Sequence, residues 1–301
     1  MPELPEVETV RRGLAQRAAG RKVAEVKALN PSIVKGSAEM LCQALPGRTI
    51  GQLHRKGKAL AIEFRSAHGQ PSCYLLVRLG MTGQLVVTSQ DSPLLPHTHL
   101  RLAFEDGREE LRFRDPRRFG LVRCCRLDEI EAIYNAMGPD ALEISQGYFV
   151  DAIKGRRGAI KGWLLNQAML AGMGNIYADE ALFLAGIHPQ TPAGRINPTA
   201  ARRLHRAVIK VLRRSVGLQG TSFRDYINIE GKPGNFSPRL QVYQRTGEPC
   251  RKCGAVLRRV IVCGRSSHFC PRCQPRPRKV APPGATRKTA AAMSRRAQGS
   301  L

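Results

Sequence analysis

The start of the chain carries apolar side chains at helical spacing. They are Val7, Val10, Leu14 and Ala18. Positions three or four apart share one face of a helix, and Gly20 is of the type that commonly ends one. We therefore predict an amphipathic helix over residues 5–19.

From about residue 22 to residue 127 the pattern changes to short segments in which apolar and polar residues alternate. Five of these segments read as strands, at residues 60–64, 73–79, 84–88, 99–104 and 110–114. Asp106-Gly107 favours a hairpin between the last two. Strands at such regular spacing predict a sandwich or barrel, and the first helix is expected to pack against it.

Beyond about residue 130 the apolar spacing becomes helical. Helices are expected at residues 145–154, 159–168, 175–185 and 198–217. The change from strands to helices places an interdomain linker near residues 128–145. A glycine-rich loop is expected at 218–236, a cysteine-containing hairpin at 240–274 and a disordered basic tail at 275–301.

The chain is strongly basic. Its 301 residues include 49 Lys and Arg against 23 Asp and Glu, a net charge of +26. The tail from Pro275 contains seven of these cations and no acid, so +19 stays on the part that we expect to fold. Such an excess predicts a polyanionic partner, most economically nucleic acid. A ribosomal or membrane-surface protein would carry the same sign, so charge defines only this broad class.

The sequence shows no run of about 18 apolar residues, and its start is acidic rather than the apolar core of a secretory signal. We therefore expect no membrane association, reduced cysteines and a cytoplasmic location. We also expect the protein to act as a monomer.

Four of the nine cysteines form the pattern Cys250-x2-Cys253-x16-Cys270-x2-Cys273. Two such pairs joined by a β-patterned stretch are typical of a tetrahedral Zn²⁺ site. Four thiolates leave no open coordination position, so the single zinc ion is expected to be structural. The stretch between the pairs contains four basic side chains, which either probe a nucleic-acid groove or form a solvated turn. They are Arg258, Arg259, Arg265 and His268.

The second residue is proline, and Glu3 and Glu6 follow it. Removal of Met1 would make Pro2 a terminal secondary amine, which forms a charged iminium when it attacks a carbonyl-like carbon. An α-amino group titrates at about 7.7–8.0, and the two glutamates are near in sequence as acid/base partners. The simpler alternative is that these residues only start the first helix, where proline and glutamate are favoured.

Three further motifs offer groups that suit a nucleic acid. In HRKGK at residues 54–58, between strands, a lysine on a tight turn can contact phosphate or protonate a leaving alkoxide. In RDPRRFG at 114–120 an arginine and an aromatic can fill a gap in a base stack, as can Met81 in a loop. Asn175 follows glycine at a helix start, where phosphate can bind. The alternatives are a charged hairpin, a core methionine and a plain helix cap.

These pieces occur in one order, and together they resemble the bacterial formamidopyrimidine-DNA glycosylase family. The resemblance covers about residues 2–274. It rests on PELPEVETVRRGL, LGMTGQL, RDPRRFG, GMGNIYADEALFLAGIHP, EGKPGNF, LQVYQRTGEPC and the two cysteine pairs. The combination is specific, because the Pro-Glu start and the zinc hairpin stand at opposite ends of the chain.

The resemblance implies an α+β multidomain protein. It would have an antiparallel β-sandwich with flanking helices at 1–130, a helix-two-turn-helix domain with a lesion-capping loop at 131–236, and a zinc-finger β-hairpin at 240–274. Damaged double-stranded DNA would lie between the lobes with the damaged nucleotide flipped into a pocket. The implied activity is excision of oxidised purines (8-oxoguanine and formamidopyrimidines) in base-excision repair, followed by lyase cleavage of the abasic site.

The resemblance also assigns the roles of the family's catalytic residues to the matching positions of this sequence. Pro2 would be the nucleophile at C1′ and Glu3 the acid/base group. Lys58 would donate a proton during β-elimination, and Arg265 would grip phosphate and assist δ-elimination.

The resemblance also implies DNA contacts. Met81, Arg117 and Phe119 would fill the void left by the flipped nucleotide. Further DNA contacts are expected from Arg78, His97, Arg157 and Asn175, and the 219–235 loop would cover the flipped base. Arg78 departs from the family's frequent histidine and makes that contact permanently charged. Arg156 and Arg157 replace a lysine-rich patch, which leaves open which of them contacts phosphate.

Two other interpretations fit parts of the sequence. An endonuclease-VIII-like glycosylase for oxidised pyrimidines shares the general plan, although the PELPEVET start and the intact RDPRRFG favour the purine branch. A non-catalytic zinc-ribbon nucleic-acid binder explains the charge and the cysteines. It does not explain why Pro2, Glu3 and Glu6 begin the chain.

Overall fold

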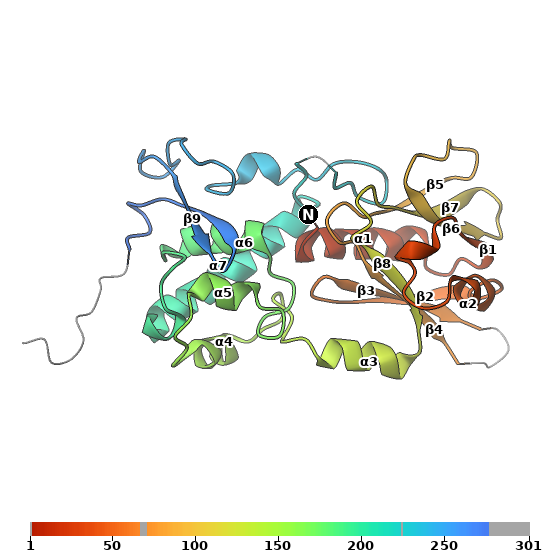
Figure 1. The fold of residues 1–301 in the computed structure, drawn as a ribbon, viewed down its shortest axis with the longest axis horizontal. Helices are drawn as coiled ribbons and strands as arrows, with labels where there is room; N and C mark the ends of the chain where they lie inside the picture. Colours follow the sequence, from red (N-terminus) through yellow and green to blue (C-terminus); the bar gives the residue numbers. More distant parts are fainter. Residues whose placement is uncertain (1, 67–70, 224, 277–301) are drawn as a thin grey trace, which may run out of the picture.

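The computed structural model describes residues 2–66, 71–223 and 225–276. Most of the tail, residues 277–301, lies outside the described residues, so its disorder stays a prediction. Along the chain, a strand-rich half is followed by a helical half and a terminal hairpin (Figure 1). None of the helices in the described residues combines the length and apolar character that a bilayer-spanning segment needs.

Two antiparallel four-stranded sheets build the strand-rich half. One has the order β1-β6-β7-β5, with β1 (Val23–Ala28), β6 (Thr98–Phe104), β7 (Glu109–Arg114) and β5 (Gln84–Ser89). The other has the order β2-β3-β4-β8, with β2 (Thr49–Lys56), β3 (Ala59–Arg65), β4 (Cys73–Arg78) and β8 (Leu121–Cys125). Alternate side chains of both sheets enter one shared apolar core, so the sheets form the predicted sandwich.

Helix α1 (Leu4–Arg17) packs its predicted apolar face into the same core. Val7, Val10 and Leu14 are each at most 1% exposed. Gly13 lies against Ile229 so closely that a Cβ would come within 2.6 Å of that side chain. The predicted helix is thus confirmed, and it also touches the helical half of the protein.

Two expectations need correction. Residues 54–56, which the pattern places between strands, lie inside β2, because a register shift between Ile50 and Leu53 interrupts the alternation that would reveal this strand. Part of the predicted linker at 128–145 is helix α3 (Leu127–Asn135), whose Ile130 is buried against side chains of β3 and β4. Pairing and packing partners, rather than local pattern, define both elements. The pattern also does not reveal β1, β8 or helix α2 (Ala38–Ala44).

Four helices form the helical half, and all four were expected. They are α4 (Gln146–Ile153), α5 (Ile160–Leu165), α6 (Asn175–Ala185) and α7 (Pro198–Gly217). Helix α6 is buried along nearly its whole length and contacts both α5 and α7. Helix α7 is amphipathic, and its Asn197 cap accepts a hydrogen bond from Ala200 N at 2.8 Å. Short 3₁₀ turns occur at Pro31–Ile33, Ala193–Arg195 and Ser237–Arg239.

The terminal hairpin consists of β9 (Arg258–Val262) and β10 (Arg265–Phe269). Two carboxylates of α6 attach this region to the helical half. Asp179 accepts from His268 N at 2.8 Å. Glu180 accepts from the backbone amides of residues 241–243 at 2.9–3.0 Å. The hairpin is therefore positioned by α6 rather than by its own small core.

Truncation of the α1 core contact tests this packing. Leu14→Ala is expected to lower the free energy of unfolding by about 3 kcal/mol, because it opens a cavity where both sheets meet the helix. The exposed neighbour Gln16→Ala is the control and should change stability by less than about 0.5 kcal/mol. Urea unfolding at neutral pH measures both. Equal effects from the two substitutions would contradict the packing.

Candidate active site and nucleic-acid interface

The beginning of the chain is buried between the two halves. Glu3 is fully buried, and its carboxylate accepts from Ile176 N at 3.1 Å and Tyr177 N at 3.5 Å, in the first turn of α6. That helix end has free N–H groups and a positive partial charge, so it suits a carboxylate. Gly174 has to be glycine here, because a Cβ would overlap the Glu3 carboxyl group. Pro2, the predicted nucleophile, is also buried beside it.

The environment of Glu3 shifts its acidity toward neutrality. Burial is the largest cause and raises the pKa of Glu3 from its ordinary 4.5 to about 7, while the charge of Lys58 opposes the rise. The neighbouring Glu6 raises this pKa further. A carboxyl group with such a pKa can both give and accept a proton near neutral pH.

Glu6 has a different role from the one that its place in the sequence suggests. Its carboxylate accepts from Glu3 N at 2.7 Å, from Thr221 N at 2.7 Å and from the Tyr177 hydroxyl. The Tyr177 hydroxyl also bonds Ser215 Oγ at 2.6 Å and Thr221 Oγ1 at 2.8 Å. Glu6 therefore joins the chain start to α6 and to the loop at 218–236.

Lys58 lies on the tight turn between β2 and β3. Gly57 has a φ of +57° there, and a Cβ on it would approach Gly172 N to 2.9 Å. The turn is held by Asp140, which accepts from Gly57 N at 2.8 Å and from Arg55 at 2.6 Å. Burial lowers the pKa of Lys58, while the charge of Glu3 opposes that shift. No sequence signal marks Asp140 as the residue that holds this turn, because Arg55 and Gly57 lie more than 80 residues earlier.

Four of the predicted site residues meet in one cavity of about 610 Å³. Lys58, Arg157, Asn175 and Arg265 line it, and Arg156 lines it as well. They come from four separate segments: the β2–β3 turn, the α4–α5 connection, the start of α6 and the tip of the terminal hairpin. The Asn175 Oδ1 atom is buried and has no hydrogen-bond partner within the described residues. The cavity thus brings cationic groups and the Asn175 amide, whose oxygen has no partner among the described residues, close to Glu3.

A second group forms where the 80–82 loop meets the 115–120 loop. Buried Asp115 joins the loops by accepting from the Thr82 hydroxyl and from Gly120 N, the latter at 2.7 Å. This leaves Phe119 57% exposed, with the Arg117 guanidinium 4.8 Å from its ring centroid. Met81 is partly buried on the adjoining loop. An exposed aromatic on a loop braced in this way suits insertion into a base stack.

Two predicted contact residues stand outside the cavity. Arg78 is exposed and pairs across the sheet with Ala59 and Leu121, so it lies between the Lys58 turn and the Phe119 loop. His97 is also exposed, and its carbonyl accepts from Asp115 N at 3.0 Å.

The four predicted zinc ligands come together. The sulfur atoms of Cys250, Cys253, Cys270 and Cys273 all lie within 4.8 Å of one another. Backbone amides donate to two of these sulfurs, which stabilises thiolates: Lys252 N lies 3.4 Å from Cys250 Sγ and Cys273 N lies 3.3 Å from Cys270 Sγ. The donor set fits one structural zinc ion with no open coordination position.

One basic side chain of the hairpin is not available to a ligand. His268 is only 7% exposed, and its Nδ1 lies 2.9 Å from Asp179, so it serves the attachment to α6. Lys161, which the pattern did not single out, is fully buried and pairs with the same carboxylate at 2.7 Å. The expectation that His268 probes a groove is therefore corrected, whereas Arg258, Arg259 and Arg265 are exposed.

The geometry defines a two-lobed zinc protein with a buried acid, a cationic cavity and an exposed aromatic loop. Three family models match consecutive segments of the chain. They are the formamidopyrimidine-DNA glycosylase N-terminal domain at residues 1–122, the formamidopyrimidine-DNA glycosylase H2TH domain at 136–226, and the zinc finger found in FPG and IleRS at 247–276. The chain belongs to the formamidopyrimidine-DNA glycosylase family.

Individual relatives agree with this assignment. The formamidopyrimidine-DNA glycosylase of Acaryochloris marina is 41% identical over 283 residues, which cover 91% of this chain and 99% of the relative. A variant of the Lactococcus lactis protein, crystallised with DNA that contains Fapy-dG, superposes with a TM-score of 0.84 at 35% identity, over 91% of this chain and 100% of that one. MutM in complex with DNA that contains carbocyclic 8-oxo-G superposes with a TM-score of 0.83 at 35% identity, with the same coverage of both chains.

The raised pKa of Glu3 makes a prediction about stability and pH. Between about pH 4.5 and 7 the folded protein holds a proton on Glu3 that the unfolded chain has lost, so this group lowers stability as pH rises. Glu3→Gln removes the effect. The free energy of unfolding of this variant, relative to that of the parent protein, should increase by about 2 kcal/mol from pH 5 to pH 8.

Urea unfolding of both proteins at the two pH values measures this difference. The exposed Glu39→Gln serves as the control and should leave the pH dependence unchanged. A constant difference between Glu3→Gln and the parent protein would show that Glu3 has an ordinary pKa.

The metal site gives a second prediction. Replacing both Cys270 and Cys273 with serine should abolish the bound zinc and greatly increase amide exchange in β9 and β10, because the small core beside the cysteines cannot hold them alone. Exchange in the sandwich should not change. Elemental analysis and hydrogen-exchange mass spectrometry test this, with Cys263→Ser, in the exposed turn, as the control. Retained zinc in the double variant would contradict the assignment.

Proposed function

We propose that this protein is a base-excision repair glycosylase that removes oxidised purines from duplex DNA and then cleaves the abasic site. The observation that carries the proposal is Glu3, a fully buried carboxyl group with a pKa near 7, beside Pro2 and the cationic cavity. The names of the relatives and the lesions in the related DNA complexes support the same substrate class. A bacterial cytoplasm is the location that this substrate implies.

The first chemical step belongs to Pro2 and Glu3. With Met1 removed, the neutral Pro2 nitrogen attacks C1′ of the damaged nucleotide, and the bond from C1′ to the base breaks with its electron pair leaving on the base. The proton that the Pro2 nitrogen then loses neutralises the departing base. Glu3 supplies a proton to the sugar ring oxygen as the ring opens, which its raised pKa allows at neutral pH. The product is an iminium between Pro2 and C1′.

Strand cleavage follows from the iminium. Its positive charge acidifies the C2′ proton, and loss of that proton expels the 3′ phosphate in β-elimination. A second elimination expels the 5′ phosphate. Lys58 lines the cavity with a lowered pKa, which suits proton transfer in these steps, and the exposed Arg265 would hold a phosphate.

The remaining residues would hold the DNA. Asn175 would bind phosphate through its side-chain NH₂ group, together with Arg157 at the same cavity. The exposed Arg78 and His97 would add further contacts to the DNA backbone. Met81, Arg117 and Phe119 would occupy the gap in the stack, and the 219–235 loop would cover the flipped base.

Covalent trapping tests the nucleophile. Borohydride reduces an iminium to a stable amine, so the mature protein incubated with an 8-oxoguanine duplex should give a protein–DNA adduct. Mass spectrometry should place it on the peptide that begins with Pro2. A variant that keeps a residue before Pro2 has a tertiary amide there and should give no adduct. Equal trapping of the extended variant would show that Pro2 is not the nucleophile.

Substrate preference tests the lesion class. We expect excision of 8-oxoguanine opposite cytosine to be at least about tenfold faster than excision of thymine glycol, measured as single-turnover rates on matched duplexes. Phe119→Ala should slow both reactions without changing their ratio, because it supports flipping rather than base recognition. Faster excision of thymine glycol would assign the protein to oxidised pyrimidines.

A further inference from the structure

Helix α7 has an exposed face that consists almost entirely of cations. Six residues of the helix are exposed Arg or Lys, and the helix contains no acid. They are Arg202, Arg203, Arg206, Lys210, Arg213 and Arg214, and we call them the α7 cationic face. Surface helices usually place acids four residues from bases, which stabilises the helix. Here the same positions hold like charges, which repel, so helix stability does not explain them.

These cations also lack acid partners among the described residues. Within residues 2–66, 71–223 and 225–276, none of the six forms an ion pair. In the same residues, one of these side chains bonds to a protein acceptor: Arg203 Nε donates to the Ala185 carbonyl at 2.8 Å. Other arginines of this protein are paired, such as Arg55 with Glu8 and Asp140. The α7 cationic face is therefore available to an external anion.

The spacing of the cations fits a nucleic-acid backbone. Arg202, Arg206, Lys210 and Arg213 follow one another at successive turns, and the α-helical rise of about 1.5 Å per residue places the first and last about 17 Å apart. One strand of duplex DNA presents a phosphate about every 3.4 Å along its axis, so about five phosphates pass along this length. A rigid helix presents the charges in a line, as a duplex requires.

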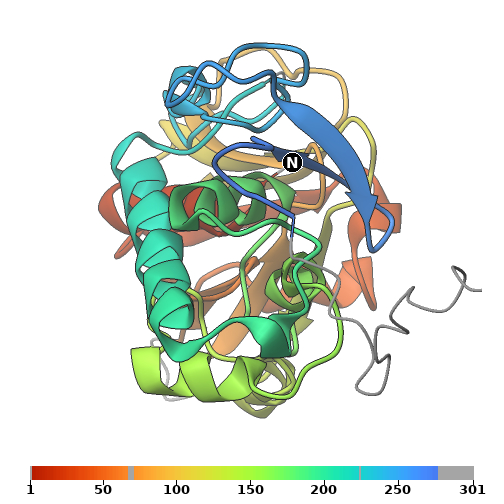
Figure 2. The ribbon, with the colours of Figure 1, turned by 90° about the vertical axis from the view of Figure 1, so that its left-hand side faces the viewer.

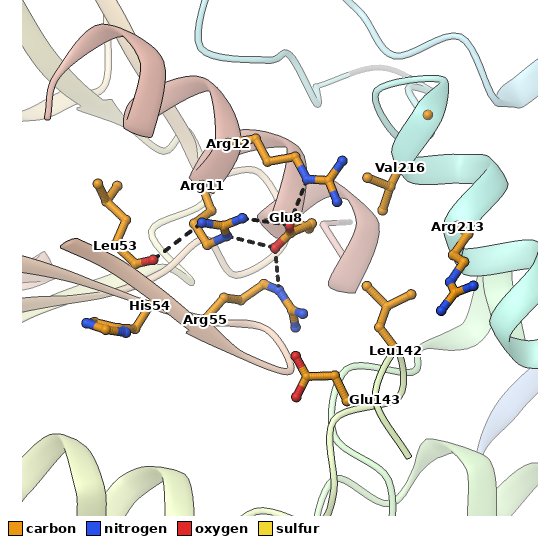
Figure 3. Close-up of a pocket in the computed structure, with 11 residues that line it drawn as sticks. Glu8, Arg11, Arg12, Leu53, His54, Arg55, Leu142, Glu143, Arg213 and Val216 are labelled. Atoms are coloured by element: carbon orange, nitrogen blue, oxygen red, sulfur yellow. Dashed lines mark hydrogen bonds and ion pairs between the residues drawn. The ribbon is translucent and has the colours of Figure 1, made fainter. Parts of the chain in front are cut away.

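The α7 cationic face continues beyond the helix into a hollow of about 590 Å³. Arg213 lines this hollow together with Arg11 and Arg12 of α1 (Figure 3). Arg11 and Arg12 both bond to the Glu8 carboxylate, which Arg55 shares as well. One carboxylate thus faces three guanidinium groups. Glu143 stands on the wall opposite Arg12, so an anion would bind at the rim formed by Arg12 and Arg213 (Figure 3).

The α7 cationic face belongs to a different side of the molecule from the candidate active site. In Figure 2, α7 runs along the left margin, whereas the β9–β10 hairpin lies toward the right. Arg265 of that hairpin lines the 610 Å³ cavity, whereas Arg213 of α7 lines the separate hollow. A duplex seated at the cavity would therefore leave α7 free for another segment.

We propose that the α7 cationic face, continued by Arg12, binds the backbone of a second duplex DNA segment while the first segment is held at the candidate active site. The contacts proposed here are to phosphates, so the second site would bind duplex DNA without sequence preference. Its use would be direct transfer from one DNA segment to another. The inference rests on the proposed function only in taking duplex DNA as the polyanion.

A variant with four substitutions, called the fourfold variant, removes the line of charges on α7. Arg202→Gln, Arg206→Gln, Lys210→Gln and Arg213→Gln eliminate four charges and keep good helix formers at exposed positions. The matched control changes four cations of the sandwich and its border by the same net charge. These are Lys22→Gln, Lys27→Gln, Arg65→Gln and Arg126→Gln, each of which is already paired with an acid.

Release from DNA is the measurement. The full-length protein is bound to a fluorescent duplex that contains a tetrahydrofuran abasic analogue, and unlabelled undamaged duplex is added at rising concentration. If the second duplex binds before the first leaves, release should accelerate by roughly threefold or more as competitor rises, and less so at high salt. The parent protein and the control should behave in this way. Release from the fourfold variant should not depend on competitor.

Two results would overturn the inference. One is release that is independent of competitor in the parent protein. The other is the same dependence in the fourfold variant, which is the outcome expected if the tail captures the second duplex. Single-turnover excision of 8-oxoguanine separates this from the proposed function. Normal excision by all three proteins shows intact folding and an intact active site, whereas no excision by the parent protein sinks the proposed function alone.

Discussion

Two buried carboxylates at the start of the chain are the constraint on which the rest of the site depends. Glu3 and Glu6 are fully buried, and their side chains accept hydrogen bonds from Ile176 N, Tyr177 N, the Tyr177 hydroxyl and Thr221 N, all in the helical half. A buried carboxylate is costly unless it is hydrogen-bonded, so the first turn of α1 is satisfied only when the two halves of the protein are assembled. Assembly of the fold and formation of the site are therefore the same event.

Helix α6 makes that assembly rigid. Its first N–H groups bind Glu3, the Tyr177 hydroxyl binds Glu6, Asp179 attaches the terminal hairpin, and Glu180 holds residues 241–243. One buried helix thus sets the positions of the acid, the cavity and the zinc-bearing hairpin relative to one another. A reaction that needs a nucleophile, an acid and phosphate-binding groups in register benefits from a single rigid reference.

The arginines divide into two populations with different roles. Those at the junctions between elements are paired with acids, as in the Glu8–Arg55–Asp140 network that holds the Lys58 turn. Those around the cavity and on α7 include exposed cations without an acid partner among the described residues. The net charge alone does not separate the structural guanidinium of Arg55 from the unpaired cations of α7, whereas the acids that lie beside Arg55 do so.

The sequence by itself determined the helix and strand order of the long periodic segments, the zinc ligands and, through the resemblance, the family, because these rest on local spacing and residue type. It did not reveal β2, α3 or the role of Asp140, since strand pairing, packing and the 83-residue separation between Asp140 and Gly57 decide them. The residues alone did not separate Glu3 from Glu6, and only the resemblance assigned the acid/base role to Glu3. Burial raises the pKa of both residues, to about 7 for Glu3, and the hydrogen bonds that Glu6 accepts from Tyr177 and Thr221 make it a structural link that only the tertiary structure shows.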